Sequence, residues 1–414
     1  MCGYLNSSDT NIEITKIFIC WLIINNMIPR KVGAKIVKDS RGEKTILVWV
    51  KTGKGKFVTI SPVGKSTGKF EVKPYVRSLA NEVDYIGKLD VSKLEIKKFN
   101  HLSYIEKYVK LGGDSLYALE ASLLKALAAE NESELYDYLG GRRVRIGSVG
   151  NAVGGGKHSQ GVKDKKPDIQ EFHFIAKSKS FKENVKINQH AYRMVGRILN
   201  ARKRNDEGAW ETGVTNEEVL EAMSLVRKVL RKNGTKVEIG LDIAANSFFK
   251  DSYRYANPGM ILTPEQQIEY VVSLIERFEL LYVEDGLDEN DFKGFANVLK
   301  KVKKNGSKCL IVGDDLTTTN PVRLRRAIKN KSINAIIVKP NQIGSLLKVK
   351  EVVEMAKAHG IKTIISHRSG ESLDSTIADL GVGFGCDYIK TGIYGKVRKS
   401  KLKRLVRIER KLNK

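Results

Sequence analysis

The chain is poor in cysteine, with four in 414 residues. Cys2, Cys20, Cys309 and Cys386 are scattered and form no C-x-x-C pair. This spacing indicates neither a disulfide framework nor a zinc site, and it suits a reducing cytoplasm. We therefore expect a cytoplasmic protein whose fold does not depend on cross-links.

Long hydrophobic runs are also missing. Residues 17–27 have about the length of a signal-peptide core and are too short to cross a bilayer. They lack a basic n-region and a small-residue cleavage site. A regular strand pattern begins just after Met27, so we expect residues 1–26 to be an upstream extension of the reading frame and residues 1–30 to lie outside the fold. No membrane partner is expected.

Acidic residues are scarce relative to basic ones. Asp and Glu number 47 against 73 Lys and Arg, which gives a net charge of +26. A basic surface can bind nucleic acid, attract anionic substrates or reflect a lysine-rich cytoplasm. No zinc-finger spacing or aromatic-interleaved basic motif accompanies the charge, so a dedicated nucleic-acid module is not supported. The content of 41% apolar and 29% charged residues is typical of a soluble globular chain with two or three domains.

Residues 31–141 are predicted to form an α+β domain. Three strands are expected, at residues 34–37, 46–50 and 56–60, with a turn at residues 39–42. A helix is expected over residues 114–130, with Asp114 or Ser115 as its N-cap. Gly140-Gly141 ends this domain.

From residue 142 to residue 414, apolar strands alternate with helical patterns, which indicates βα units and a parallel sheet or barrel. Eight strands are expected, as a closed α/β barrel requires. They lie near residues 144–146, 171–176, 237–243, 280–283, 309–312, 335–338, 363–365 and 388–389. A long helical region, residues 183–202, separates the second strand from the third.

Ionisable residues follow six successive strands of the predicted barrel. They are Asp242, Glu284, Asp314, Lys339, His367-Arg368 and Lys390. The carboxyl ends of parallel strands meet at one mouth, where enzymes of this architecture place their chemistry. One such charge is readily explained by solvation at a strand end, but six in register indicate a functional site.

The order of the charges along the barrel suggests a reaction. The first three residues supply only oxygen ligands, which suit Mg²⁺. The next three strands carry cations, which suit an anionic substrate. Lys339 lies where a base would abstract a proton α to a carboxylate, and we expect the metal and the neighbouring cations to lower its pKa.

An elimination also needs an acid on the opposite face. Glu171 and Glu207 are the candidates, and both remain open at this point. Ser66 and His158 lie in glycine-rich loops that could cover the site. Gly154-Gly155-Gly156 is weak evidence for phosphate binding, because glycine runs are usually turns.

The residues named so far resemble those of enolase over about residues 34–408. The most specific stretches are residues 366–371, 313–317, 339 and 341–344, supported by residues 39–42, 240–245 and 389–392. The chain is identified as a divergent, archaeal-type or enolase-like member. The resemblance implies an enolase-type barrel with an N-terminal capping domain, two Mg²⁺ ions, and a homodimer or larger oligomer. It implies reversible dehydration of 2-phosphoglycerate to phosphoenolpyruvate in glycolysis.

The resemblance also assigns roles to individual residues. It makes Lys339 the general base and Glu207 the general acid, with Glu171 assisting. The residues assigned to magnesium are Asp242, Glu284 and Asp314 for the first ion and Ser66 for the second. The residues assigned to the substrate are Arg368 and Ser369 on the phosphate, Lys390 on the carboxylate side, and His158, Glu171 and His367 around the closed site.

The chain departs from the family pattern in three loops. The first loop, residues 63–68, carries Lys65 where the family has alanine, and residues 162–166 form a lysine-rich insert. The acid motif, residues 205–212, contains Ala209-Trp210-Glu211 in place of Gly-Phe-Ala. None of these changes removes a catalytic group, but they leave the closure of the site open.

Two other functions remain as alternatives. One is an enolase-like enzyme that acts on another carboxylate. The other is a basic binding protein, suggested by residues 396–414, which carry ten Lys or Arg against Glu409 alone. We favour a terminal helix packed on the barrel with a solvated basic face, so nucleic acid is not required and only weak contact through the basic surface is expected.

Overall fold

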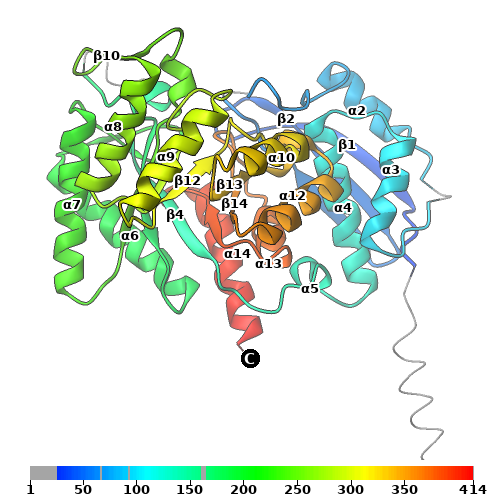
Figure 1. Cartoon of the computed structure of the whole chain (residues 1–414). Helices are drawn as coiled ribbons and strands as arrows, with labels where there is room; N and C mark the ends of the chain where they lie inside the picture. The colour runs from blue at the N-terminus through cyan, green and yellow to red at the C-terminus, as the bar shows by residue number, and fades with distance from the viewer. Residues whose placement is uncertain (1–25, 66–67, 92–93, 160–164, 414) are drawn as a thin grey trace, which may run out of the picture.

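The structure is a computed structural model and describes residues 26–65, 68–91, 94–159 and 165–413. It contains a β/α barrel and, beside it, a smaller part built from an antiparallel sheet and helices (Figure 1). This architecture confirms the predicted eight-stranded β/α barrel with an N-terminal α+β domain. Within the described residues, no helix combines the length and the apolar composition that a membrane crossing requires.

The N-terminal sheet has three antiparallel strands in the order β1-β2-β3, with bounds Lys31–Lys38, Lys44–Thr52 and Gly55–Ile60. The helices of this part are α2 (Leu79–Gly87), α3 (Leu102–Tyr108), α4 (Gly113–Glu130) and α5 (Leu135–Tyr138). The side chains of Ile46, Val48 and Val50 alternate along β2 and are fully buried. Helix α4 packs against this strand, and the three predicted strands are confirmed.

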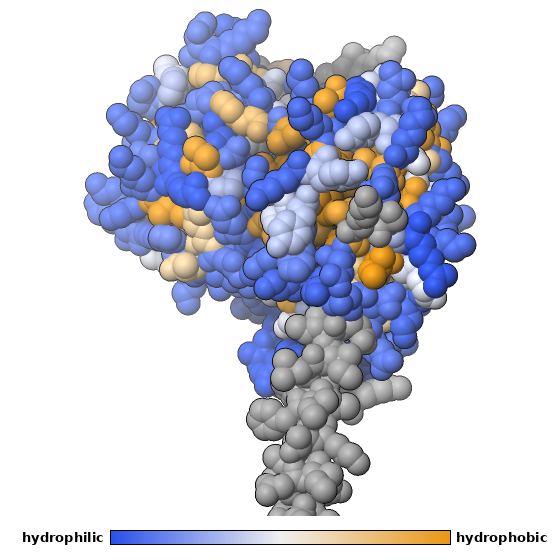
Figure 2. All heavy atoms as spheres, turned by 90° about the vertical axis from the view of Figure 1, so that its right-hand side faces the viewer, coloured by the Kyte–Doolittle hydropathy of each residue, from blue (hydrophilic) through white to orange (hydrophobic). Residues whose placement is uncertain are grey.

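The outer side of the N-terminal part mixes polar and apolar surface. Figure 2 faces this side of the molecule and shows hydrophobic residues surrounded by hydrophilic ones. Exposed apolar side chains of this part include Ile36 on β1 and Tyr104 and Tyr108 on α3. Exposed apolar surface often serves contacts between proteins, but the homodimer or larger oligomer stays a prediction.

The predicted N-cap of the helix over residues 114–130 is wrong. Helix α4 begins one residue earlier and is capped by Gly112, without a side-chain cap. Asp114 lies within the first turn, is 2% exposed and points toward the barrel. The side-chain amide of Asn341 donates a hydrogen bond of 2.8 Å to the Asp114 carboxylate. Asp114 therefore joins the two parts of the molecule instead of capping its helix.

Replacing Asp114 with asparagine should change how stability depends on pH. Burial raises the pKa of Asp114 to about 6, so the folded chain holds this proton more tightly than the unfolded chain does. The cost of ionising the group, about 2–3 kcal/mol, is absent below the unfolded pKa and is present in full above pH 6. We expect Asp114→Asn to unfold at higher urea concentration than the parent at pH 7.5 and at a similar concentration at pH 4. An equal difference at both pH values would contradict this assignment.

The barrel is one closed sheet of eight strands with a short ribbon attached. The sheet order is β15-β14-β13-β12-β11-β8-β5-β4-β7-β6, and β15 also pairs with β4. The barrel strands are β4 (Gly147–Gly154), β5 (Glu171–Ala176), β8 (Glu238–Asp242), β11 (Tyr282–Glu284), β12 (Leu310–Gly313), β13 (Ala335–Val338), β14 (Lys362–Ser366) and β15 (Tyr388–Lys390). The ribbon strands are β6 (Lys203–Arg204) and β7 (Trp210–Glu211), and a separate hairpin contains β9 (Tyr253–Tyr255) and β10 (Met260–Leu262).

Strand β5 runs antiparallel to both of its neighbours, β4 and β8. The first barrel units therefore depart from simple βα order. Glu171 begins β5 and pairs with Asp242, the last residue of β8. This reversed direction brings Glu171 to the same mouth as the residues that end the parallel strands.

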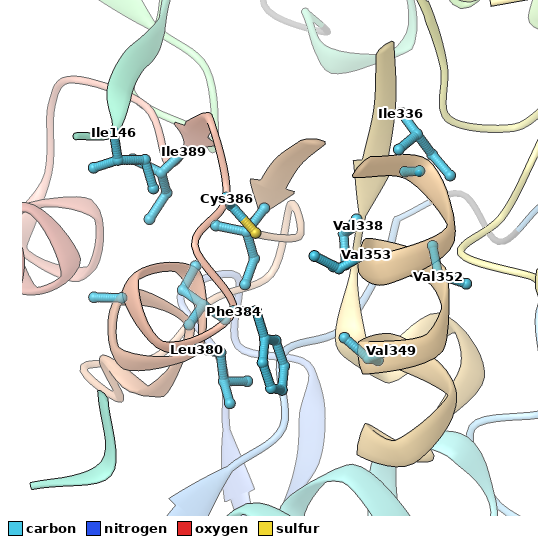
Figure 3. Close-up of a cluster of buried hydrophobic side chains, with 14 of the residues drawn as sticks. Ile146, Ile336, Val338, Val349, Val352, Val353, Leu380, Phe384, Cys386 and Ile389 are labelled. Atoms are coloured by element: carbon cyan, nitrogen blue, oxygen red, sulfur yellow. The ribbon is translucent and has the colours of Figure 1, made fainter. Parts of the chain in front are cut away.

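Helices cover the outside of the barrel. They are α6 (Phe181–Ile198), α7 (Asn216–Lys232), α8 (Pro264–Arg277), α9 (Phe292–Lys304), α10 (Pro321–Asn330), α12 (Leu346–Ala358), α13 (Thr376–Gly383) and α14 (Lys396–Leu412). The one-turn helix α11 (Pro340–Ile343) follows the end of β13 and contacts α4. Figure 3 shows Val349 and Val353 of α12 in the same buried cluster as Val338 of β13. The two helix side chains are four residues apart, so they lie on one face of the helix and cover the strand.

The first predicted barrel strand, residues 144–146, is wrong. The strand is β4, and all eight of its residues are buried. Its glycines are required by close neighbours, since a Cβ atom at Gly147 would lie 2.4 Å from the ring of Tyr388 and one at Gly150 would lie 2.5 Å from Ile393. Glycine has low strand propensity, so these tertiary contacts hide the strand from a pattern search.

The folded chain begins earlier than expected. Met27 is fully buried and forms an antiparallel bridge with Ile96. Residues 27–30 therefore contact the fold, although the sequence predicted that residues 1–30 lie outside it. Residues 1–25 lie outside the described residues.

The predicted packing of the C-terminal helix is confirmed. Leu402, Leu405 and Ile408 of α14 are buried in the core. Glu409 on the same helix accepts hydrogen bonds from the backbone N–H groups of Phe181 and Lys182 at the start of α6. Helix α14 thereby supplies the carboxylate that the N-terminus of α6 favours.

Candidate active site

A cavity of about 260 Å³ opens at the mouth of the barrel, between the strand ends and the first loop of the N-terminal part. The predicted site residues that line it are His158, Glu171, Glu207, Asp242, Asp314, Lys339, His367, Arg368, Ser369 and Lys390. Glu284 is fully buried and contacts Lys390. Ser66 and residues 162–164 of the predicted insert lie outside the described residues.

Lys390 is surrounded by carboxylates. Its Nζ atom lies 2.9 Å from Asp242, 2.8 Å from Glu284 and 3.3 Å from Glu171. All four side chains are buried, and these carboxylates hold the pKa of Lys390 well above its usual value although burial acts against the charge. Lys390 is therefore a permanent cation on the floor of the cavity.

Lys339 pairs with Asp314 at the adjacent strand ends. Burial favours the neutral amine, but the Asp314 charge outweighs this effect and raises the pKa of Lys339. Arg368 and Lys390 act to lower this pKa, as predicted, but they do not outweigh Asp314 in the protein alone, and the expected effect of the metal stays a prediction. The sequence places Asp314 one strand away from Lys339, but it does not show that the two side chains form an ion pair.

Buried carboxylates are concentrated next to this ion pair. Asp285 accepts hydrogen bonds from the backbone N–H groups of Asp314 and Asp315, at 3.1 and 2.7 Å. Burial and the neighbouring carboxylates raise the pKa of Asp315 to about 7 and that of Asp285 well above its usual value. Asp285 and Asp315 are residues that the sequence analysis did not assign to the site.

This arrangement fits a hard divalent cation. Oxygen atoms of Asp285, Asp314 and Asp315 lie within 4.8 Å of one another. Burial and the Asp242 charge also raise the pKa of Glu284 well above its usual value. Such crowding of buried carboxylates is unfavourable until a cation neutralises it, and an oxygen-only donor set suits Mg²⁺.

Two further carboxylates on the cavity lining, Glu207 and Glu171, have pKa values shifted in opposite directions. Burial and the Glu171 charge raise the pKa of Glu207 to about 6. Burial also acts to raise the pKa of Glu171, but Lys390 and two histidines hold it well below its usual value. His158 lies 3.5 Å from Glu171 and 3.7 Å from Glu207, and His173 lies 2.8 Å from Glu171. Glu207 is thus suited to donate a proton, while Glu171 stays ionised.

Arg368 and Ser369 line one side of the cavity. The Arg368 guanidinium makes a forked pair with Glu71, at 2.8 and 3.1 Å. The Ser369 hydroxyl accepts a hydrogen bond of 2.7 Å from the backbone N–H of Lys65. A fork of this kind also matches phosphate, and Glu71 was not identified from the sequence.

The loop that carries Arg368 and Ser369 is held by α14. The buried Arg398 guanidinium donates hydrogen bonds to the carbonyl groups of Arg368 and Ser369, at 2.7 and 2.5 Å. Lys401 pairs with Glu371 at 2.7 Å and is also buried. Two cations that the sequence suggested for a solvated face therefore support the site. Burial and the Arg398 charge also lower the pKa of His367 well below its usual value.

Comparisons with known proteins agree with this geometry. The family model described as "Enolase, C-terminal TIM barrel domain" matches residues 147–414. A protein named "Enolase" from Archaeoglobus fulgidus is 36% identical over 405 residues, covering 94% of this chain and 98% of its own length. Proteins of the same name from Picrophilus torridus and Thermoplasma acidophilum are 35% and 34% identical, covering 90% and 92% of this chain and 96% and 97% of their own lengths.

Proposed function

Because the chain belongs to the enolase family of lyases, we propose that it catalyses the reversible, Mg²⁺-dependent dehydration of 2-phospho-D-glycerate to phosphoenolpyruvate. The observation that carries this proposal is the placement of Lys339 and Glu207 on the lining of one cavity, together with Arg368 and Ser369. This set provides a base, an acid and an anion-binding loop. The expected setting is glycolysis or gluconeogenesis in the cytoplasm.

The protein's own groups would divide the reaction into two proton transfers. The Lys339 amine removes the proton from C2, and the electron pair of that C–H bond moves toward the substrate carboxylate. Glu207 donates a proton to the C3 hydroxyl, which leaves as water while the C2–C3 double bond forms. Glu171 stays ionised and, by its charge, raises the pKa of Glu207 and so favours the protonated acid.

We assign Asp242, Glu284 and Asp314 to magnesium, with Asp285 and Asp315 next to Asp314. When bound, Mg²⁺ would supply positive charge that lowers the pKa of Lys339 through Asp314 and neutralises the charge accumulating on the substrate carboxylate. The carboxylate crowding described above supports this assignment. Ser66 is retained as the predicted ligand of a second ion.

The substrate would be oriented by its two anionic ends. We assign the phosphate to Arg368 and Ser369 and the carboxylate side to Lys390, with His158 and His367 lining the site. Arg368 is 4% exposed and its guanidinium is held on Glu71, so a phosphate must replace that carboxylate to use the same N–H donors.

A substrate panel distinguishes this function from action on another carboxylate. We expect the ultraviolet absorbance of an α,β-unsaturated acid to develop with 2-phosphoglycerate and not with 3-hydroxy acids that lack the phosphate. Equal or faster turnover of an unphosphorylated acid would favour the enolase-like alternative.

A further inference from the structure

The proposed acid, Glu207, lies in the turn of a very short ribbon. Strands β6 and β7 pair through only two residue pairs, 203 with 211 and 204 with 210. A two-stranded ribbon of this length has little stability of its own. The position of the Glu207 carboxylate must therefore depend on contacts that attach the ribbon to the barrel. On one side β7 pairs with β4, and the Asn151 side-chain amide donates a hydrogen bond of 3.3 Å to Glu207.

Tyr192 of α6 makes the central attachment. Its hydroxyl donates a hydrogen bond of 2.7 Å to the carbonyl of Gly208, the residue after Glu207. The same hydroxyl accepts a hydrogen bond of 2.8 Å from Arg204 Nε on the other ribbon strand. Tyr192 itself is 3% exposed, so its side of both bonds is buried.

Trp210 completes the attachment through its ring. It stacks on Tyr192 with ring centres 5.0 Å apart, and its indole N–H donates a hydrogen bond of 2.9 Å to the Tyr192 carbonyl. Helix α6 leaves room for this ring at Gly196, where a Cβ atom would lie 2.5 Å from the indole. The Arg204 guanidinium also lies over the Trp210 ring, 3.9 Å from its centre.

These contacts occur where the chain departs from the family pattern, at residues 209–211. We propose that Tyr192 is a positioning residue for Glu207, holding the acid-bearing ribbon against α6 through the Gly208 carbonyl. This role rests on the proposed function of Glu207. It predicts that loosening Tyr192 impairs loss of water from C3 and leaves proton removal at C2 intact, because Lys339 is carried by a different strand end.

The test compares Tyr192→Phe with a matched control, Tyr270→Phe. The first variant removes only the hydroxyl, so the stacked ring remains. The second removes a hydroxyl from a partly buried tyrosine on α8 whose ring packs on Tyr255. Four quantities are measured in Mg²⁺-saturated protein: kcat and KM for phosphoenolpyruvate formation, exchange of the C2 hydrogen of 2-phosphoglycerate with D₂O, and backbone amide exchange over residues 203–211.

We expect Tyr192→Phe to lower kcat about tenfold, because misplaced catalytic groups lose much of their effect. KM and C2 exchange should change less than about twofold, amide exchange of the ribbon should accelerate, and Tyr270→Phe should match the parent. An unchanged kcat, or a parallel fall of kcat and C2 exchange, would overturn the positioning role. Absence of turnover in the parent protein would reject the proposed function instead, and amide exchange would then decide separately whether Tyr192 anchors the ribbon.

Discussion

Lys339→Ala is expected to lower the rate of phosphoenolpyruvate formation by about 10²- to 10⁴-fold, the contribution of a positioned proton-transfer group. Lys339 follows β13 directly and pairs with Asp314 beside the proposed metal ligands. The shorter side chain places no base near C2 of the substrate. The rate should be measured at saturating Mg²⁺ by the ultraviolet absorbance of the product.

Proton exchange separates this effect from a general loss of structure. Lys339→Ala should also abolish exchange of the C2 hydrogen with D₂O, whereas Glu207→Gln should reduce product formation and retain that exchange. Lys329→Ala, which removes an exposed lysine of α10, is the matched control and should be unaffected. Near-parental turnover in Lys339→Ala would exclude it as the base.

Lys390→Met should destabilise the fold as well as stop the reaction. Without the Lys390 ammonium, Asp242, Glu284 and Glu171 remain buried together with no common cation. Breaking a buried ion pair by removing one partner costs about 3–5 kcal/mol. We therefore expect a clear fall in the urea midpoint of unfolding in the presence of a chelator, and a loss of turnover of at least about a hundredfold.

The same experiment should show partial recovery with magnesium. Mg²⁺ that binds the folded state stabilises it by mass action, so the midpoint of Lys390→Met should rise more on adding Mg²⁺ than that of the parent. Lys329→Met controls for the loss of a lysine at an exposed site. A midpoint equal to that of the parent would show that Lys390 does not balance these carboxylates.

The strand ends of the barrel could be predicted from local sequence. A short apolar run followed by an ionisable residue, as in residues 335–339, marks both a buried strand and the point where it reaches the mouth. This rule alone places Asp242, Asp314, Lys339 and Lys390 at one mouth. It works because each strand and its terminal charge are adjacent in the chain.

The supports of the site could not be predicted in this way. Arg398 and Lys401 lie on a basic helix, and only the packing of that helix shows that their charges are buried against the loop of Arg368. Tyr192 and Glu207 are separated by fifteen positions and belong to different elements. Such contacts depend on how helices and strands pack against one another, and the periodicity of the sequence does not predict them.

Strand β4 and the pKa of Lys339 illustrate the same limit. The glycines of β4 are explained by Tyr388 and Ile393 on distant elements, so local propensity indicates the wrong segment. The pKa of Lys339 depends on its contact with Asp314, which the order of charges along the chain does not reveal. Local sequence patterns identified the ionisable residues of the site, whereas the distances between their side chains determine their pKa values.

Magnesium-dependent formation of phosphoenolpyruvate is the most direct measurement of the proposed function. The protein is treated with a chelator, dialysed, and mixed with 2-phosphoglycerate while Mg²⁺ is titrated and the ultraviolet absorbance is followed. We predict no change before Mg²⁺ is added, a saturable rise as it is added, and no rise with Lys339→Ala. Folded, Mg²⁺-saturated protein that produces no phosphoenolpyruvate would contradict the proposal.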